Sequence, residues 1–167
     1  YDYKNGIMYA LGNAGRVSRL LKIDLGSGEV TEVAELYQEF VAIAIDLQGQ
    51  IYAENPYSEL VKLELDGNEE TLNSCDYSAK SELQSMGIDH KTGRLWWAKP
   101  TSREGTQLLN IDLKSGYYDT NVELTGEKQI VGLDFPYSNV KEGAPGKMEK
   151  LEITPVNDGA KEVNITV

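Results

Sequence analysis

The chain has 167 residues, with 27 acidic and 16 basic side chains and a formal net charge of −11. A surface this acidic repels nucleic-acid phosphates and anionic membranes, so we expect no nucleic-acid partner and no membrane insertion. Cys75 is the only cysteine and His90 the only histidine, which excludes an internal disulfide, a cysteine-rich metal site and a multi-histidine zinc centre.

A short sequence motif recurs along the chain. Each of its three copies begins with a glycine: Gly6 followed by Ile-Met-Tyr-Ala, Gly49 followed by Gln-Ile-Tyr-Ala, and Gly93 followed by Arg-Leu-Trp-Trp-Ala. A repeat of this spacing indicates one supersecondary unit copied along the chain.

Short apolar runs within each copy predict strands. In the first copy Leu21, Ile23 and Leu25 alternate with Lys22 and Asp24, and this period of two is a strand signal rather than a helical stripe. In chain order the predicted strands are 6–10, 20–25, 42–46, 49–53, 60–65, 69–73, 85–89, 93–98, 108–113 and 130–135, and a further strand is expected directly after each of the segments 24–28 and 112–116.

The connections between these strands predict tight hairpins. Segments 24–28, 46–49, 89–93 and 112–116 each begin with Asp and end with Gly. An Asp carboxylate accepts from backbone N–H groups two residues on, and the Gly takes a positive φ. No segment predicts a helix, so we expect an all-β fold.

Four antiparallel strands in each repeat predict the blade of a β-propeller. The strands suffice for about three four-stranded blades within residues 1–136, and we expect a propeller fragment. Segment 130–135 either closes a small ring against the first strand or begins a further blade of a larger propeller; we favour the larger propeller. Small residues at Ala44, Gly87 and Gly132 fit an innermost strand near the axis.

The repeat ends and the amino-acid composition changes after residue 136. Segment 137–146 is rich in Gly, Pro and charge and predicts a linker. Segment 147–167 holds two alternating runs around an Asn-Asp-Gly turn, which predict a hairpin, the start of a partial β-sandwich. This segment resembles the opening of a fibronectin type III-like module.

Segments 88–96 and 20–31 resemble YVTN- or NHL-type propeller repeats. A propeller followed by a fibronectin-like segment is similar to exported multidomain surface proteins of Bacteroides-like bacteria. The resemblance implies an extracellular, periplasmic or cell-surface location and contacts with neighbouring domains of the same parent chain.

No catalytic signature stands out, and we expect no metal site and no cofactor. Asp46, Asp89 and Asp134 recur at the ends of the innermost predicted strands. Asp46 and Asp89 begin hairpin turns, so capping of the turn is the preferred interpretation over acid–base or metal chemistry. His90 lies within one of these turns and is interpreted as a solvated turn residue.

Ligand binding is predicted at the longer, irregular connections, because variable loops on a rigid scaffold are the usual place for it. Aromatic rings beside Asn and Arg can stack on a glycan or hold a peptide or protein segment. The candidate residues are Arg16, Tyr37, Asn55, Tyr57, Lys99 and Arg103.

The preferred hypothesis is therefore a non-enzymatic binding or scaffold module. One alternative is a divalent-metal-dependent hydrolase, lyase or lactonase that uses the repeated aspartates, and another is a purely structural spacer. The aligned Tyr9, Tyr52 and Trp96 are predicted to lie in the core between blades, with Trp97 pointing the other way.

Overall fold

The computed structural model describes residues 1–74, 84–100, 105–124, 130, 132–135, 152–155 and 163–166. These residues form strands and turns, and none of them is helical. The all-β prediction is confirmed, and within the described segments there is accordingly no helix of the length and apolarity needed to span a membrane.

Three antiparallel sheets follow one another along the chain. We name them the first, second and third blades. The first holds β1 (Met8–Ala14), β2 (Val17–Ile23) and β3 (Val30–Glu35). The second holds β4 (Ala42–Ile45), β5 (Ile51–Glu54), β6 (Glu59–Leu63) and β7 (Glu69–Ser74). The third holds β8 (Ser85–Asp89), β9 (Arg94–Pro100), β10 (Thr106–Asp112) and β11 (Tyr118–Leu124).

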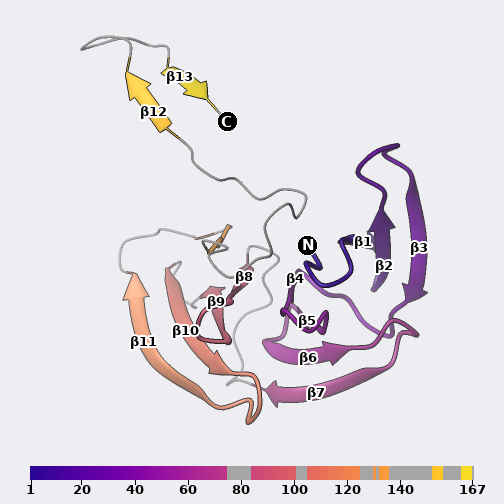
Figure 1. Ribbon diagram of the computed structural model, residues 1–167. Helices are drawn as coiled ribbons and strands as arrows, with labels where there is room; N and C mark the ends of the chain where they lie inside the picture. The colour runs from indigo at the N-terminus through magenta and orange to yellow at the C-terminus, as the bar shows by residue number, and fades with distance from the viewer. Residues whose placement is uncertain are drawn as a thin grey trace.

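The blades are arranged around a common centre. Figure 1 shows β4 and β8 near this centre and the outer strands β3, β7 and β11 along the periphery. Every strand within a blade pairs with its neighbour in sequence. This is the arrangement of a β-propeller fragment, as the repeat predicts.

The predicted hairpin turns are present. In the β4–β5 turn the Asp46 carboxylate accepts from the backbone N–H groups of Gln48 and Gln50, both at 2.9 Å, and Gly49 has a φ of 84°. In the β8–β9 turn Asp89 accepts from the N–H of Lys91 at 3.0 Å. The capping role that the sequence predicts for both aspartates is confirmed.

The core consists of two clusters, one on each face of the second blade. Between the first and second blades, Tyr9, Leu20 and Phe40 pack with β5 and β6. Between the second and third blades, Tyr52 and Trp97 pack with Leu60, Met86, Ile88, Leu95, Leu109 and Ile111. Burial of these faces is what joins one blade to the next.

The prediction for the two tryptophans is wrong in part. Trp97 is completely buried, whereas Trp96 is only half-buried and its ring lies 6.4 Å from that of Phe135. The aligned Tyr9 and Tyr52 each face the following blade. Trp96 therefore faces away from the second blade, while Trp97 faces the second blade and fills the cluster between the two.

The strand predicted at 130–135 is also wrong. Residues 130 and 132–135 are not in a strand. The backbone N–H of Leu133 donates to Ser85 Oγ at 2.9 Å and that of Ile130 donates to Thr106 Oγ1 at 3.0 Å. Side-chain hydroxyls of the third blade thus take the place of a ladder, and the described residues of this segment are bound to β8 and β10.

A separate hairpin follows near the end of the sequence. Strands β12 (Glu152–Pro155) and β13 (Val163–Thr166) pair antiparallel, which confirms the predicted hairpin. The predicted linker, 137–146, lies outside the described residues. The domain boundaries and the fibronectin-like module stay predictions.

Candidate functional site

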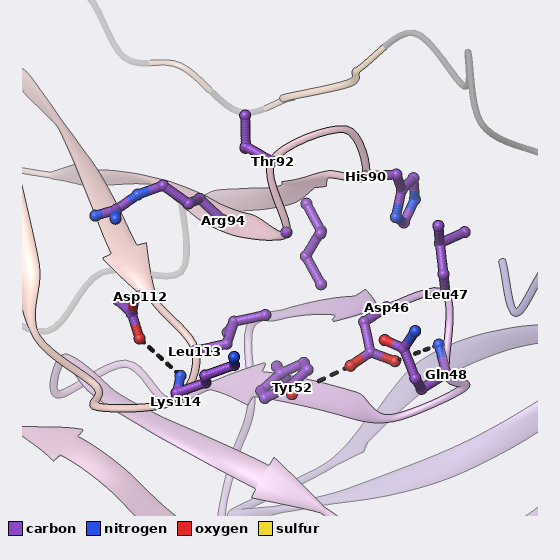
Figure 2. Close-up of a pocket in the computed structure, with 12 residues that line it drawn as sticks. Asp46, Leu47, Gln48, Tyr52, His90, Thr92, Arg94, Asp112, Leu113 and Lys114 are labelled. Carbon is purple, nitrogen blue, oxygen red and sulfur yellow. Dashed lines mark hydrogen bonds between the residues drawn. The ribbon is translucent and has the colours of Figure 1, made fainter.

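A cavity of about 540 Å³ opens between the second and third blades. Three turns line it: the β4–β5 turn of the second blade and the β8–β9 and β10–β11 turns of the third blade. Figure 2 shows the side chains that line it. Turns that look like isolated hairpins in the sequence become neighbours at this edge because adjacent blades pack face to face.

The wall from the second blade carries a carboxylate in a fixed position. Asp46 Oδ1 accepts the two backbone N–H groups of its turn, and Oδ2 accepts from the Tyr52 hydroxyl at 3.3 Å. Burial, the Asp46 charge and this hydrogen bond raise the pKa of Tyr52 to about 12. The phenol therefore stays a donor at physiological pH and orients the carboxylate toward the cavity edge.

The wall from the third blade carries the single histidine. His90 is half-buried, and its ring lies 5.9 Å from that of Tyr3. Burial lowers the pKa of His90, against the opposing charges of Asp46, Asp89 and Asp134. The imidazole is neutral at neutral pH and offers one donor and one acceptor. His90 lies in the β8–β9 turn, as predicted, but its ring is half-buried beside Tyr3 instead of fully solvated.

Two cations lie on the same wall. Arg94 donates through Nε to Asn110 Oδ1 and through Nη2 to the Asn110 carbonyl at 3.4 Å. It pairs in register with Asp112, whose carboxylate accepts from the N–H of Lys114 at 2.9 Å and that of Ser115 at 3.0 Å. Hydrogen bonds from Ser115 and Lys114 lower the pKa of Asp112, and the Arg94 charge adds to this effect.

Lys114 is the exposed cation of the site. Its ammonium forms no ion pair with any described residue. The site thus combines two fixed carboxylates, two cations, a neutral imidazole and a phenol with an apolar lining of Leu47, Ile88 and Leu113. This combination suits hydrogen bonding to a small polar molecule. Among the described residues no group of three or more His, Cys, Asp or Glu side chains could hold a metal ion.

The residues predicted for binding lie elsewhere, on the connections at the other ends of the strands. Arg16 is exposed in the β1–β2 turn, and Tyr37 and Tyr57 are 78% and 52% exposed. Asn55 and Lys99 are buried. Arg103 lies outside the described residues. None of the five described candidates lines the cavity.

Three of these residues are linked by one hydrogen-bond network. The Tyr37 N–H donates to Glu69 at 2.8 Å, and Glu69 also accepts from Gln38 at 2.9 Å. Gln38 accepts from Asn55 at 2.7 Å, and Asn55 Oδ1 accepts from the N–H of Tyr57 at 3.0 Å. Asn55 therefore holds two connections together, and only the tyrosine rings are presented to solvent.

A buried acid beside Lys99 is absent from the sequence prediction. Glu54 is completely buried at the end of β5, and neither carboxylate oxygen has a hydrogen-bond partner among the described residues. Burial raises the pKa of Glu54 well above its usual value of 4.5, and the charge of Lys99 opposes this rise. Lys99 itself lies 5.6 Å from the centre of the Trp97 ring.

Sequence reasoning missed the cavity because every residue in it also has a sufficient local explanation. Asp46 and Asp112 cap their own turns, and Tyr52 belongs to the core. One signal was available: polar and charged residues occupy corresponding turns of neighbouring repeats. In a propeller those turns share an edge, so their side chains converge.

Comparisons with known proteins show a distant likeness of fold. No protein-family model and no curated protein sequence matches the chain. An auxiliary nutrient binding protein from Bacteroides thetaiotaomicron is similar over 80% of this chain, with 13% identity and a TM-score of 0.51. A protein of unknown function from Bacteroides caccae (70% of this chain, 18% identity, TM-score 0.49) and a protein from Lactobacillus plantarum (71%, 13%, 0.47) are more weakly similar.

The chain spans 32%, 41% and 38% of the lengths of these three proteins, in the order given. At 13% identity, the likeness to the nutrient binding protein shows a shared all-β fold and no more.

Proposed function

We propose that this chain is a non-enzymatic binding module that holds a small polar ligand between its second and third blades. The observation that carries the proposal is the cavity of about 540 Å³ with polar groups fixed on both walls. Ligand pockets typically have volumes of about 300–1,000 Å³ and a few convergent polar groups on an apolar lining. Turns supported by rigid strands are well placed to hold such groups.

Preorganisation favours binding at this site. The Asp46 carboxylate is already oriented by two backbone N–H groups and the Tyr52 phenol, and Asp112 by its own turn. Little conformational entropy is lost when a ligand meets groups that are already fixed. The nutrient-binding role named for one structural neighbour is in keeping with this function.

The proposal includes the setting that the sequence suggests. The repeats are of YVTN or NHL type, the hairpin β12–β13 opens a fibronectin-like module, and the parent protein is exported to the cell surface or beyond. The tyrosines of the opposite edge, Tyr37 and Tyr57, are a second surface where a glycan, peptide or protein segment would stack.

The test is a thermal-shift and calorimetric screen of the full chain with saccharides, amino acids and dipeptides, each with and without EDTA. A ligand at a hundredfold excess over its Kd stabilises the folded state by about 2.7 kcal/mol. The variant Gln48→Trp places a large ring on an exposed lining residue and should abolish the effect, whereas Tyr57→Ala should leave it unchanged. Binding that survives Gln48→Trp and is lost in Tyr57→Ala would move the site to the opposite edge.

A further inference from the structure

The cavity carries opposite charges that its own residues do not neutralise. Asp46 forms no ion pair with a described residue, and neither does Lys114. Lys4 lies beside the Asp46 turn, but its ammonium donates to the Gln48 carbonyl at 2.8 Å instead. His90 of the facing blade feels the Asp46 charge, but burial lowers its pKa, so the imidazole is neutral at neutral pH and does not offset that charge.

The two uncompensated charges lie on different walls. Asp46 comes from the second blade and Lys114 from the third, and Figure 2 shows them on either side of Tyr52. Arg94 is on the same wall as Lys114, where Asp112 offsets part of its charge. The second-blade wall is therefore anionic, and the third-blade wall has one cation in excess.

We infer that the cavity takes a zwitterion: a free amino acid or short peptide whose ammonium meets Asp46 and whose carboxylate meets Lys114. Each end would form a charge-assisted hydrogen bond, which is about twice as strong as a neutral one. A neutral saccharide would leave both protein charges without a counter-charge in a partly enclosed site. This inference rests on the proposed function and specifies its ligand.

The apolar part of the lining predicts the side chain of that ligand. Leu47, Ile88 and Leu113 contribute apolar surface to the cavity, and Ile88 belongs to the buried cluster between the blades. An apolar side chain would remove this surface from water at a gain of about 25 cal/mol for each Å². Leucine and glycyl-leucine are therefore suitable probes.

The experiment measures the affinity of the full chain for leucine and glycyl-leucine, for N-acetyl-leucine and leucinamide, and for glucose and N-acetylglucosamine. Blocking either charge of the probe should weaken binding by about tenfold, the value of one charge-assisted hydrogen bond. Lys114→Gln should weaken the binding of leucine by about tenfold and leave the affinity for leucinamide unchanged. Asp46→Asn should weaken the binding of leucine and leave the affinity for N-acetyl-leucine unchanged.

Matched controls carry the same charge changes away from the cavity. Asp24 caps the β2–β3 turn of the first blade through the same kind of carboxylate–backbone hydrogen bonds, so Asp24→Asn controls for loss of a turn cap. Lys22→Gln controls for loss of an exposed cation. If the saccharides bind and the amino acids do not, the zwitterion inference is wrong while the proposed function stands. If no probe binds at millimolar concentration, both fail. If the blocked probes bind as tightly as leucine, the assignment of the charged ends is overturned.

Discussion

The substitution Glu54→Gln should remove a marked dependence of stability on pH. Glu54 is completely buried without a hydrogen-bond partner among the described residues, and its pKa is raised by burial well above 4.5. The folded protein therefore keeps a proton that the unfolded chain releases. Stability that is present below pH 4.5 is lost progressively as the pH rises toward the folded-state pKa.

The size of the effect follows from linkage. Between the unfolded and folded pKa values, one proton is released on unfolding, and the free energy of unfolding falls by about 1.4 kcal/mol for each pH unit. Glutamine has the shape of the neutral acid and does not titrate. The difference in stability between the wild type and Glu54→Gln should therefore change with this slope above pH 4.5 and level off once the folded carboxyl has ionised.

Urea denaturation of both proteins at pH 5, 6, 7 and 8 measures this difference directly. Other titrating groups are common to both proteins and cancel in the comparison. Glu29→Gln removes an exposed glutamate of the first blade and controls for the loss of one charge. Parallel stability curves for the wild type and Glu54→Gln over this range would refute the reasoning.

Lys99 provides an independent check. Its charge lowers the pKa of Glu54, so Lys99→Met should extend the pH-dependent loss of stability to higher pH. The same substitution in the Glu54→Gln background should add no pH dependence. A double-mutant cycle at pH 8 reports this coupling.

Three further predictions concern the scaffold. Trp97→Ala should lower the free energy of unfolding by about 3–5 kcal/mol, because it empties the centre of the cluster between the second and third blades; Trp97→Phe should cost less, as urea denaturation would show. Gly116→Ala should destabilise the third blade, since a Cβ there would lie 2.5 Å from the Leu72 carbonyl oxygen and φ is 67°; an unchanged melting temperature would contradict the packing of that turn. Ser115→Ala should raise the pKa of Asp112 slightly in an NMR titration, because it removes the Ser115 Oγ hydrogen bond and leaves the backbone N–H groups of Ser115 and Lys114 in place. The stability that the Oγ hydrogen bond gives is present above the unfolded pKa and is lost as the pH falls through the folded value.

Much of the scaffold could be predicted because its determinants are local. The alternation in 20–25 and the Asp-to-Gly turns specify strands and hairpins within a few residues, and the β4–β5 turn forms as expected. The strand predicted at 20–25 also forms, but as β2 at 17–23, and Leu25 lies in the following turn with 56% of its surface exposed. The described residues of the strand predicted at 130–135 form no ladder, and the side-chain hydroxyls of Ser85 and Thr106 accept from backbone N–H groups there instead. Local pattern alone does not reveal such a competing partner.

The candidate binding residues likewise show what local sequence predicts and what it does not. Aromatic and polar loop residues predicted a surface at one edge, and Tyr37 and Tyr57 are exposed there. The cavity lies at the other edge, where Asp46 of one blade and His90 of the next line its walls. These lining residues are separated by about one repeat, so no short stretch of sequence contains both.

The sequence by itself determined the repeat, the order of the strands, the turns and the all-β class, because each depends on side-chain alternation and turn chemistry between near neighbours. Only the tertiary structure decided that Trp97 rather than Trp96 fills the core, that Glu54 is buried beside Lys99, and that Asp46 and Lys114 line opposite walls of one cavity. The physical reason is that burial and charge environment depend on which face of a blade its neighbour covers, and this is set by packing between blades rather than within them.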